Sequence, residues 1–221
     1  MAIGSVVSIV TDSLVMCFDA ANSRSYSGSG NTWTDLTNNS TANVSVLTYA
    51  GSGGTAHFSF SGAGNTRAQV TGVSTWQYGT GPRTVMAWAY PTTTSGWKQV
   101  IGWGSGVNTA SGLAIDSSGK WATFSHDTAG YPSNTSVVAN TWSHVTITHS
   151  SSGYEIYING VLDKSDVNTI NVVQSTAYIG ASFDNREWWE GRIAQVLFYN
   201  KKLTAAEIKQ NYNATKGRYR S

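Results

Sequence analysis

Short runs of alternating apolar and polar residues, broken by turn residues at intervals of roughly ten positions, fill most of the chain. Successive side chains on a strand point to opposite faces, so this alternation is typical of strands with one buried face. The pattern predicts strands over residues 13–20, 43–49, 56–60, 83–91, 97–104, 112–116 and 120–125. The helical patterns that a βαβ fold requires between strands are not found, so an antiparallel two-sheet β-sandwich is expected.

Two of these segments also predict how their side chains are oriented. Alternation in residues 13–20 places Leu14, Met16 and Phe18 on one face. Residues 83–91 are apolar on both faces, which indicates a central strand; the two sets are Met86, Trp88 and Tyr90, and Val85, Ala87 and Ala89.

The second half of the chain predicts one hairpin and one helix. Residues 141–150 and 153–160 form the hairpin, joined by a polar turn. In the helix "LTAAEIKQNYNATKG", Thr204 is the expected N-cap and Glu207 its capping-box partner. Leu203 and Ile208 occupy the two hydrophobic-staple positions, and Gly217 is the expected stop.

Composition narrows the class of protein. Aromatic residues make up 12% and the net charge is only +2, which excludes a disordered chain and gives no attraction toward nucleic acid. No apolar run is long enough to span a membrane, and no Lys or Arg precedes the first apolar residues, so neither membrane insertion nor a secretory signal is expected. Cys17 is the only cysteine, so an intrachain disulfide is excluded and a buried thiol is expected.

Three stretches resemble a known family. Residues 141–162, "TWSHVTITHSSSGYEIYINGVL", are similar to the central hairpin of laminin-G-like, or concanavalin A-like, jelly rolls. Residues 177–182 and 189–208 resemble the closing strand and terminal helix of that superfamily. Residues 17–40 resemble the opening of the variety found in short proteins of tailed bacteriophages and marine bacteria. The resemblance implies a jelly-roll fold and is not specific for an activity.

The adjacent tryptophans in "FDNREWWEG" take opposite roles in this resemblance, which implies that Trp189 packs in the core and Trp188 is exposed. Further along, Ile193, Val196 and Phe198 cannot share a face by strict alternation. A β-bulge near residues 194 and 195 is therefore predicted.

Enzymatic chemistry finds little support in the sequence. Glycosidases of this superfamily need two carboxylates about 5 to 10 Å apart, and the retaining members' Glu-x-Asp-x-x-Glu run is absent. The remaining pairs, Glu187 with Glu190 and Asp163 with Asp166, are interpreted as solvated charges. The histidines are assigned to packing or hydrogen bonding, since they form no zinc motif. No enzyme activity and no resident cofactor are expected.

Calcium is the one metal that the resemblance raises. In pentraxin-like relatives, calcium is bound at a rim by two loops, which correspond here to residues 60–67 and 181–188. Calcium prefers six to eight oxygen ligands. These loops offer Asp184, Asn185 and Asn65 as the candidate ligands, and a plain surface loop is the alternative.

Sugar or partner binding is the remaining hypothesis, because exposed aromatic rings stack on sugars or anchor protein interfaces. Trp188 with Asp184, Asn185 and Arg186 forms the first candidate group. Further candidates are Trp97, Trp76 and Tyr78, for which a role in covering the core is the alternative.

These observations predict one β-sandwich domain over residues 13–221, preceded by an arm over residues 1–12. The arm is a candidate for docking to other virion proteins, with a disordered terminus as the alternative; its apolar residues are Ile3, Val6, Val7 and Ile9. The hypothesis is a virion structural or adhesion protein, made in the host cytoplasm, present in multiple copies or as a homo-oligomer, in a capsid decoration, tail or fibre, that also contacts cell-surface glycans. A free bacterial lectin module, and a glycoside hydrolase or lyase, are the alternatives.

Overall fold

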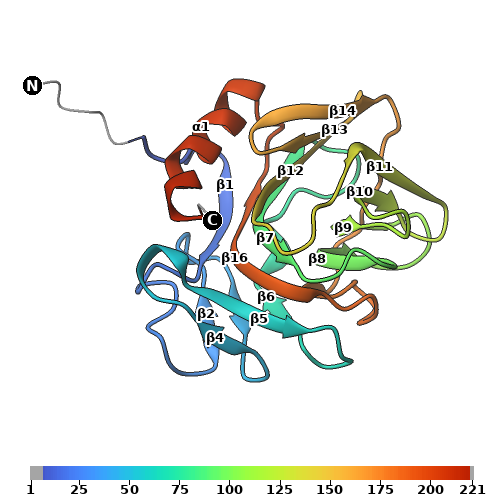
Figure 1. Ribbon diagram of the computed structural model, residues 1–221. Helices are drawn as coiled ribbons and strands as arrows, with labels where there is room; N and C mark the ends of the chain where they lie inside the picture. Colours follow the sequence, from blue (N-terminus) through green and yellow to red (C-terminus); the bar gives the residue numbers. More distant parts are fainter. Residues whose placement is uncertain (1–6, 220–221) are drawn as a thin grey trace, which may run out of the picture.

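Two antiparallel sheets packed face to face form the molecule, as described by a computed structural model for residues 7–219 (Figure 1). The first sheet runs β4 (Thr48–Ala50), β5 (His57–Ser61), β16 (Glu190–Tyr199), β7 (Arg83–Pro91), β12 (Ser143–Ser150), β13 (Gly153–Ile158) and β14 (Val161–Asp166), with β1 (Leu14–Asp19) also pairing with β16. The second sheet runs β11 (Ala129–Ser136), β10 (Lys120–Ser125), β9 (Ala110–Ile115), β8 (Lys98–Gly104), β15 (Ala177–Ile179), β6 (Ala68–Thr71), β3 (Thr41–Asn43) and β2 (Thr32–Thr34). The predicted two-sheet β-sandwich is confirmed.

The main core fills the space between the sheets, and its largest members are four fully buried tryptophans: Trp33, Trp103, Trp121 and Trp189. As predicted, β7 is a central strand, paired with β12 on one side and β16 on the other. Val85, Ala87 and Ala89 point into this core, while Met86 and Trp88 point to the outer face of the first sheet.

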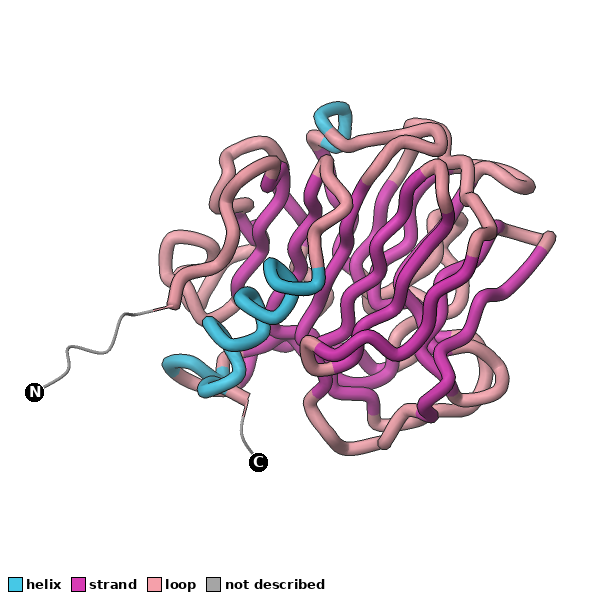
Figure 2. Tube along the Cα trace, turned by 90° about the horizontal axis from the view of Figure 1, so that it is seen from above, coloured by secondary structure: helices cyan, strands magenta, loops and turns pink. Residues whose placement is uncertain are grey.

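Helix α1 (Ala205–Thr215) lies across that outer face (Figure 2). Its N-terminus has the predicted capping box, in which the Thr204 hydroxyl accepts from the Glu207 backbone N–H and the Glu207 carboxylate accepts from the Thr204 backbone N–H. Ile208, on the inner side of α1, is buried together with Leu203 and Met86 between the helix and the sheet, in what we call the cluster beneath α1. The predicted stop at Gly217 is wrong: α1 ends at Thr215, and Gly217 belongs to the following 3-10 turn, Lys216–Arg218, designated η3.

The predicted bulge in β16 is confirmed by a shift in its pairing with β7 between Ile193 and Gln195. The extra residue allows Ile193, Val196 and Phe198 all to point into the main core. A similar shift between Leu14 and Met16 contradicts the prediction for β1. Met16 points into the main core, whereas Leu14 packs with the cluster beneath α1.

The predicted single strand over residues 43–49 is also wrong, because the chain turns at residues 44–47 and passes from β3 in the second sheet to β4 in the first. Two further short 3-10 turns, η1 (Gly53–Thr55) and η2 (Val73–Thr75), lie in connections. The hairpin of β12 and β13 has the predicted turn, with Ser150 opposite Gly153.

The described part of the N-terminal arm packs on its own domain. The Val10 backbone N–H donates to Asn211 Oδ1 at 2.7 Å, and Tyr199 Oη donates to the Val10 carbonyl at 2.9 Å. Ile9 is half-buried and packs against the cluster beneath α1, whereas Val7 is exposed. Ile3 and Val6, the other two residues predicted to dock, lie outside the described residues.

Candidate functional site

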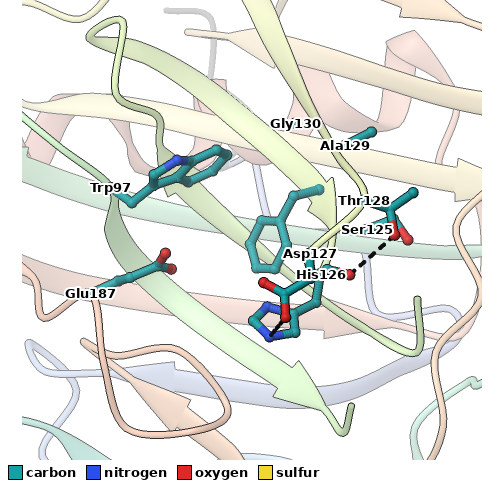
Figure 3. A pocket seen from close by; sticks show the side chains of 9 residues that line it. Trp97, Ser125, His126, Asp127, Thr128, Ala129, Gly130 and Glu187 are labelled. Carbon is teal, nitrogen blue, oxygen red and sulfur yellow. Dashed lines mark hydrogen bonds and ion pairs between the residues drawn. The ribbon is translucent and has the colours of Figure 1, made fainter. Parts of the chain in front are cut away.

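An open hollow with a volume of about 290 Å³ lies on the outer face of the second sheet, at the end that carries β8, β10 and β11 (Figure 3). Trp97 stands on one side, the turn between β10 and β11 on the other, and Glu187 reaches in from the loop before β16. The lining residues are Trp97, Phe124, Ser125, His126, Asp127, Thr128, Ala129, Gly130 and Glu187.

An aromatic wall forms one side of the hollow. Phe124 alternates with the inward-facing Trp121 and Thr123 of β10, so its ring points outward. The Trp97 indole meets that ring edge-on, with centroids 5.6 Å apart. Gly130 leaves room for the indole, because a Cβ there would lie 3.0 Å from two Trp97 ring atoms. Trp97 remains half-buried and faces the hollow.

The loop of residues 181–188 forms a further edge of the hollow and lies directly on the second sheet. It approaches Gly102 of β8 so closely that a Cβ there would lie 2.8 Å from the Ser182 Cα. The Phe183 ring meets the His126 ring edge-on, with centroids 4.6 Å apart. A glycine at position 102 is therefore a condition for the loop to reach the hollow.

Glu187 is fixed from two directions. Its carbonyl accepts from the Gln99 backbone N–H at 2.9 Å, and its carboxylate accepts from Gln99 Nε2 at 2.7 Å. Its φ of +53° lies in the left-handed region; all other non-glycine residues in that region within residues 7–219 are Asn, Asp or Ser. Burial raises the pKa of Glu187, against the opposing effect of the Gln99 hydrogen bond. The interpretation of Glu187 as a solvated charge is wrong.

His126 and Asp127 supply the polar side of the hollow. His126 Nε2 lies 3.3 Å from an Asp127 carboxylate oxygen, and the Asp127 side chain is 62% exposed. A ligand in the hollow thus meets an aromatic surface together with carboxylate and imidazole groups. Aromatic faces pack on the apolar face of a sugar ring, and such polar groups bind its hydroxyls.

The predicted group around Trp188 forms a neighbouring cluster. Arg186 Nε donates to an Asp184 oxygen at 2.5 Å, and Trp188 Nε1 donates to Asn185 Oδ1 at 3.2 Å. Burial raises the pKa of Asp184, but hydrogen bonds from Ser182 and Arg186 outweigh it and lower the pKa. Trp188 is half-buried rather than exposed, since its ring lies beside Gly64; Trp189 is fully buried, as expected.

Two of the predicted aromatic candidates lie elsewhere. Trp76 is 4% exposed and stacks on Phe198 with centroids 4.4 Å apart, so it is a core residue. Tyr78 packs against the main core, and its hydroxyl donates to the Val73 carbonyl at 2.8 Å. Of the tryptophans proposed from the sequence, Trp97 is the one that lines the hollow.

The loops expected to bind calcium do lie side by side, because a Cβ at Gly64 would lie 3.4 Å from the Trp188 ring. Asn65 is exposed, while Asp184 is already bound to Arg186 and Ser182. Within residues 7–219, no group of three or more His, Cys, Asp or Glu side chains is arranged to hold a metal ion. Among the described helices, none has the length and apolar character needed to cross a membrane.

The fold places the chain among the antiparallel two-sheet β-sandwich proteins, here with an open hollow on the outer face of one sheet. A model of the concanavalin A-like lectin/glucanases superfamily matches residues 75–209, and the chain belongs to this superfamily. The match covers the strands from β7 to β16 and the first half of α1. None of the curated protein sequences compared with the chain matches it.

Solved structures with the same fold come from several proteins. A Trypanosoma rangeli sialidase in complex with the inhibitor DANA has a TM-score of 0.69 and 18% identity, covering 93% of this chain and 33% of the sialidase. The binding domain of botulinum neurotoxin serotype G has a TM-score of 0.67 and 17% identity, covering 90% and 50%. Domain 4 of AbnA, a GH43 extracellular arabinanase from Geobacillus stearothermophilus in complex with arabinotriose, has a TM-score of 0.66 and 14% identity, covering 91% and 98%. The chain spans about a third of the sialidase chains, and at these identities the likeness shows the fold alone.

Proposed function

We propose that this chain is a non-catalytic glycan-binding domain and that the hollow beside Trp97 is its binding site. The observation that carries the proposal is the half-buried Trp97 indole facing Glu187 and His126 across an open hollow. Its volume of about 290 Å³ matches the lower end of small-ligand sites. The arabinanase domain with a similar fold, described in complex with arabinotriose, supports a sugar as the ligand.

A glycan array, followed by calorimetry with the best ligand and with arabinotriose, tests this proposal. Trp97→Ala is expected to weaken binding by at least about tenfold, because the stacking surface is lost. Trp188→Ala is the comparison, since its ring is half-buried in the neighbouring cluster and not among the lining residues. Unchanged affinity in Trp97→Ala would exclude the hollow as the site.

The proposed setting is the surface of a tailed-phage virion, where the domain would serve in adhesion as a capsid decoration, tail or fibre component in several copies. The resemblance of residues 17–40 to phage-encoded examples supports this setting. A free bacterial lectin module is the alternative. Mass spectrometry of purified particles distinguishes them, because a virion component is found in the particles and a free lectin is not.

One observation favours a second function, a glycoside hydrolase or lyase. Glu187 and Asp127 line the same hollow, and a carboxyl group with a raised pKa suits a general acid. Against it, Asp127 is largely exposed and lies against His126. Shortening of a polysaccharide by the wild-type protein, abolished by Glu187→Gln, would establish this function and exclude the non-catalytic one.

A further inference from the structure

A second hollow region, made of two adjoining hollows of about 230 and 240 Å³, occupies the other end of the same sheet face. The two share Asn43 and Gln69, which project outward from β3 and β6. Amides and hydroxyls dominate the lining, and its one charged group is Arg67. We call this region the Arg67 hollow.

The charge of the Arg67 hollow is opposite to that of the hollow beside Trp97. No carboxylate lines it, although the chain has 12 acidic residues, all within the described range. The hollow beside Trp97, in contrast, contains the carboxylates of Asp127 and Glu187. The two ends of this face therefore prefer different groups on a ligand.

Arg67 is held in place while its donors remain largely unused. Its guanidinium lies over the Tyr178 ring, 4.9 Å from the centroid, and its remaining contact is a long hydrogen bond of 3.4 Å from Nη1 to Asn65 Oδ1. Its Nε is buried without an acceptor, and it forms no ion pair with any carboxylate in residues 7–219. Because Nε is buried, the Nη groups are the donors that the positioned guanidinium can offer, and they match the oxygens of a carboxylate or sulfate.

Strand register connects the two hollows in one straight row across the sheet. Successive partners in the row are Gly112, Gly102, Tyr178, Gln69, Asn43 and Thr32. Phe124, in the wall of the first hollow, lies against Gly112 at the start of the row. Four strand spacings separate Gly112 from Asn43, roughly 19 Å, which is the scale of a short oligosaccharide. The loop of residues 181–188 covers the row at Gly102, so a ligand that reaches both hollows has to pass over this loop.

We propose that the Arg67 hollow binds the anionic group of an acidic glycan, a uronic acid carboxylate or a sulfate ester, whose uncharged part occupies the hollow beside Trp97. This inference rests on the proposed glycan-binding function and specifies its ligand class. Tyr178 positions Arg67, and the amides of Asn43 and Gln69 bind the neighbouring hydroxyls.

Calorimetry at about 0.15 M salt, where long-range attraction is screened, tests the proposal with three probes of matched length: an oligogalacturonate, a sulfated oligosaccharide and an uncharged arabino-oligosaccharide. At least one anionic probe is expected to bind more tightly than the uncharged one. Arg67→Gln is expected to weaken that binding about tenfold and leave the uncharged probe unaffected. The two anionic probes separate carboxylate from sulfate as the preferred group.

Arg192→Gln is the matched control, because Arg192 lies over the Tyr90 ring at 4.7 Å but on β16 of the other sheet. It removes one positive charge and a similar arginine–tyrosine pair, at a site away from the proposed ligand. Equal losses of affinity for the anionic probe in the two variants would therefore overturn the proposal. Unchanged affinity in Arg67→Gln, or no preference for either anionic probe, would also overturn it. Trp97→Ala distinguishes failure of the anion site from failure of the proposed glycan site. If Trp97→Ala weakens binding of the uncharged probe while Arg67→Gln leaves the affinity for the anionic probes unchanged, the glycan site is supported and the anion site is excluded.

Discussion

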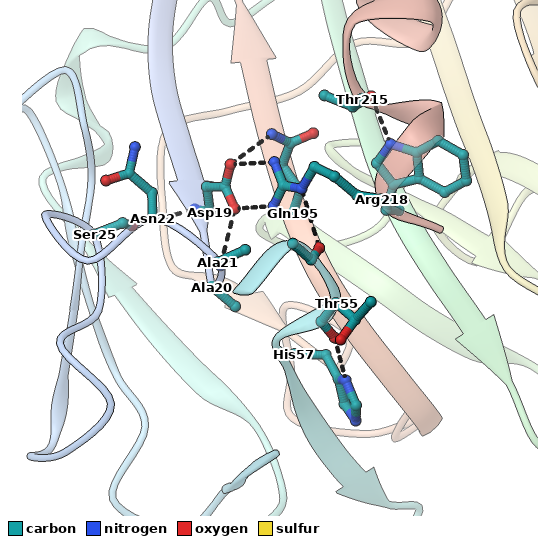
Figure 4. A network of polar contacts seen from close by, with 12 residues as sticks. Asp19, Ala20, Ala21, Asn22, Ser25, Thr55, His57, Gln195, Thr215 and Arg218 are labelled. Atoms are coloured by element: carbon teal, nitrogen blue, oxygen red, sulfur yellow. Dashed lines mark hydrogen bonds and ion pairs between the residues drawn. The ribbon is translucent and has the colours of Figure 1, made fainter. Parts of the chain in front are cut away.

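Asp19 and Arg218, separated by 199 positions in sequence, form a two-pronged ion pair that joins the end of β1 to the segment after α1 (Figure 4). Arg218 Nη1 donates to Asp19 Oδ2 at 2.8 Å, and Nη2 donates to the other carboxylate oxygen. Gln195 Nε2 also donates to Asp19, at 3.1 Å, and Arg218 Nε donates to the Gly54 carbonyl. The pair therefore connects β1, the bulge of β16 and the chain end at a single point.

Breaking this pair is expected to destabilise the fold. Arg218→Ala leaves the Asp19 carboxylate, whose side chain is 9% exposed, without its cation, and should cost about 2–4 kcal/mol in free energy of unfolding. Adding Asp19→Ala should cost less than the sum of the two single changes. Urea unfolding measures all three variants. Asp12→Ala, which removes an exposed partner of Lys201, is the control and should lower the free energy of unfolding much less than Arg218→Ala does, because solvent screens its ion pair.

Arg83 is a buried cation whose hydrogen bonds go to backbone carbonyls. It is fully buried at the start of β7 and donates to the carbonyls of Gly79, Gly81 and Ile170 at 3.0–3.1 Å. Burial lowers its pKa to about 10. Arg83→Lys keeps the charge but cannot reproduce the planar fork, so we expect a loss of about 2–4 kcal/mol, measured by urea unfolding. A loss below about 1 kcal/mol would mean that the three carbonyls need no guanidinium.

The elements that were predicted correctly are those with a strong local signal. The bulge in β16 follows from three apolar residues that cannot alternate, and the helix start follows from the Thr204–Glu207 spacing. Strand β11, in contrast, was not predicted, because "AGYPSNTS" is polar and contains Pro132. It is an edge strand of the second sheet, where proline and solvent-facing polar residues are tolerated.

Of the residues that line the hollow, Trp97 alone was a predicted binding residue, because sheet order rather than sequence spacing assembles the hollow. Phe124, His126 and Asp127 come from β10 and its turn, while Glu187 comes from a loop some sixty positions later. The pairing of β8 with both β9 and β15 brings them together, and no local pattern encodes that order. Trp76 was wrongly predicted as a binding residue. The local sequence around a tryptophan near a turn does not distinguish a ring that covers the core from one that faces solvent.

The different roles of Trp97 and Trp76 can be separated by one pair of variants. Trp76→Ala removes a ring that is 4% exposed and stacked on Phe198, so it should cost about 3–5 kcal/mol of stability. Trp97→Ala removes a half-buried ring and should cost less than about 2 kcal/mol. Thermal and urea unfolding measure both changes. A larger loss in Trp97→Ala than in Trp76→Ala would assign Trp97 a structural role.

Calcium is expected to have no effect on the domain. Asp184 is engaged by Ser182 and Arg186, and Asn65 is an exposed amide, so a calcium ion would have to break existing contacts to gain a carboxylate. Addition of calcium after treatment with a chelator should leave the unfolding midpoint and the affinity for the glycan unchanged. A rise in the midpoint that Asp184→Asn abolishes would instead establish the rim site.

Glu187 should make stability depend on pH in the direction opposite to an ordinary ion-paired carboxylate. Because its folded-state pKa is raised above 4.5, the folded protein binds the proton more tightly than the unfolded chain does. Its contribution is fully present below pH 4.5 and is lost as the pH rises through the folded-state pKa. The stability of Glu187→Gln relative to wild type should therefore increase with pH across that window, as measured by urea unfolding at successive pH values.

Asp184→Asn provides the contrast: the pKa of Asp184 is lowered from 3.8, so its contribution is lost as the pH falls below that value. A constant or falling difference between Glu187→Gln and wild type would mean that the Gln99 hydrogen bond, rather than burial, controls this carboxyl group.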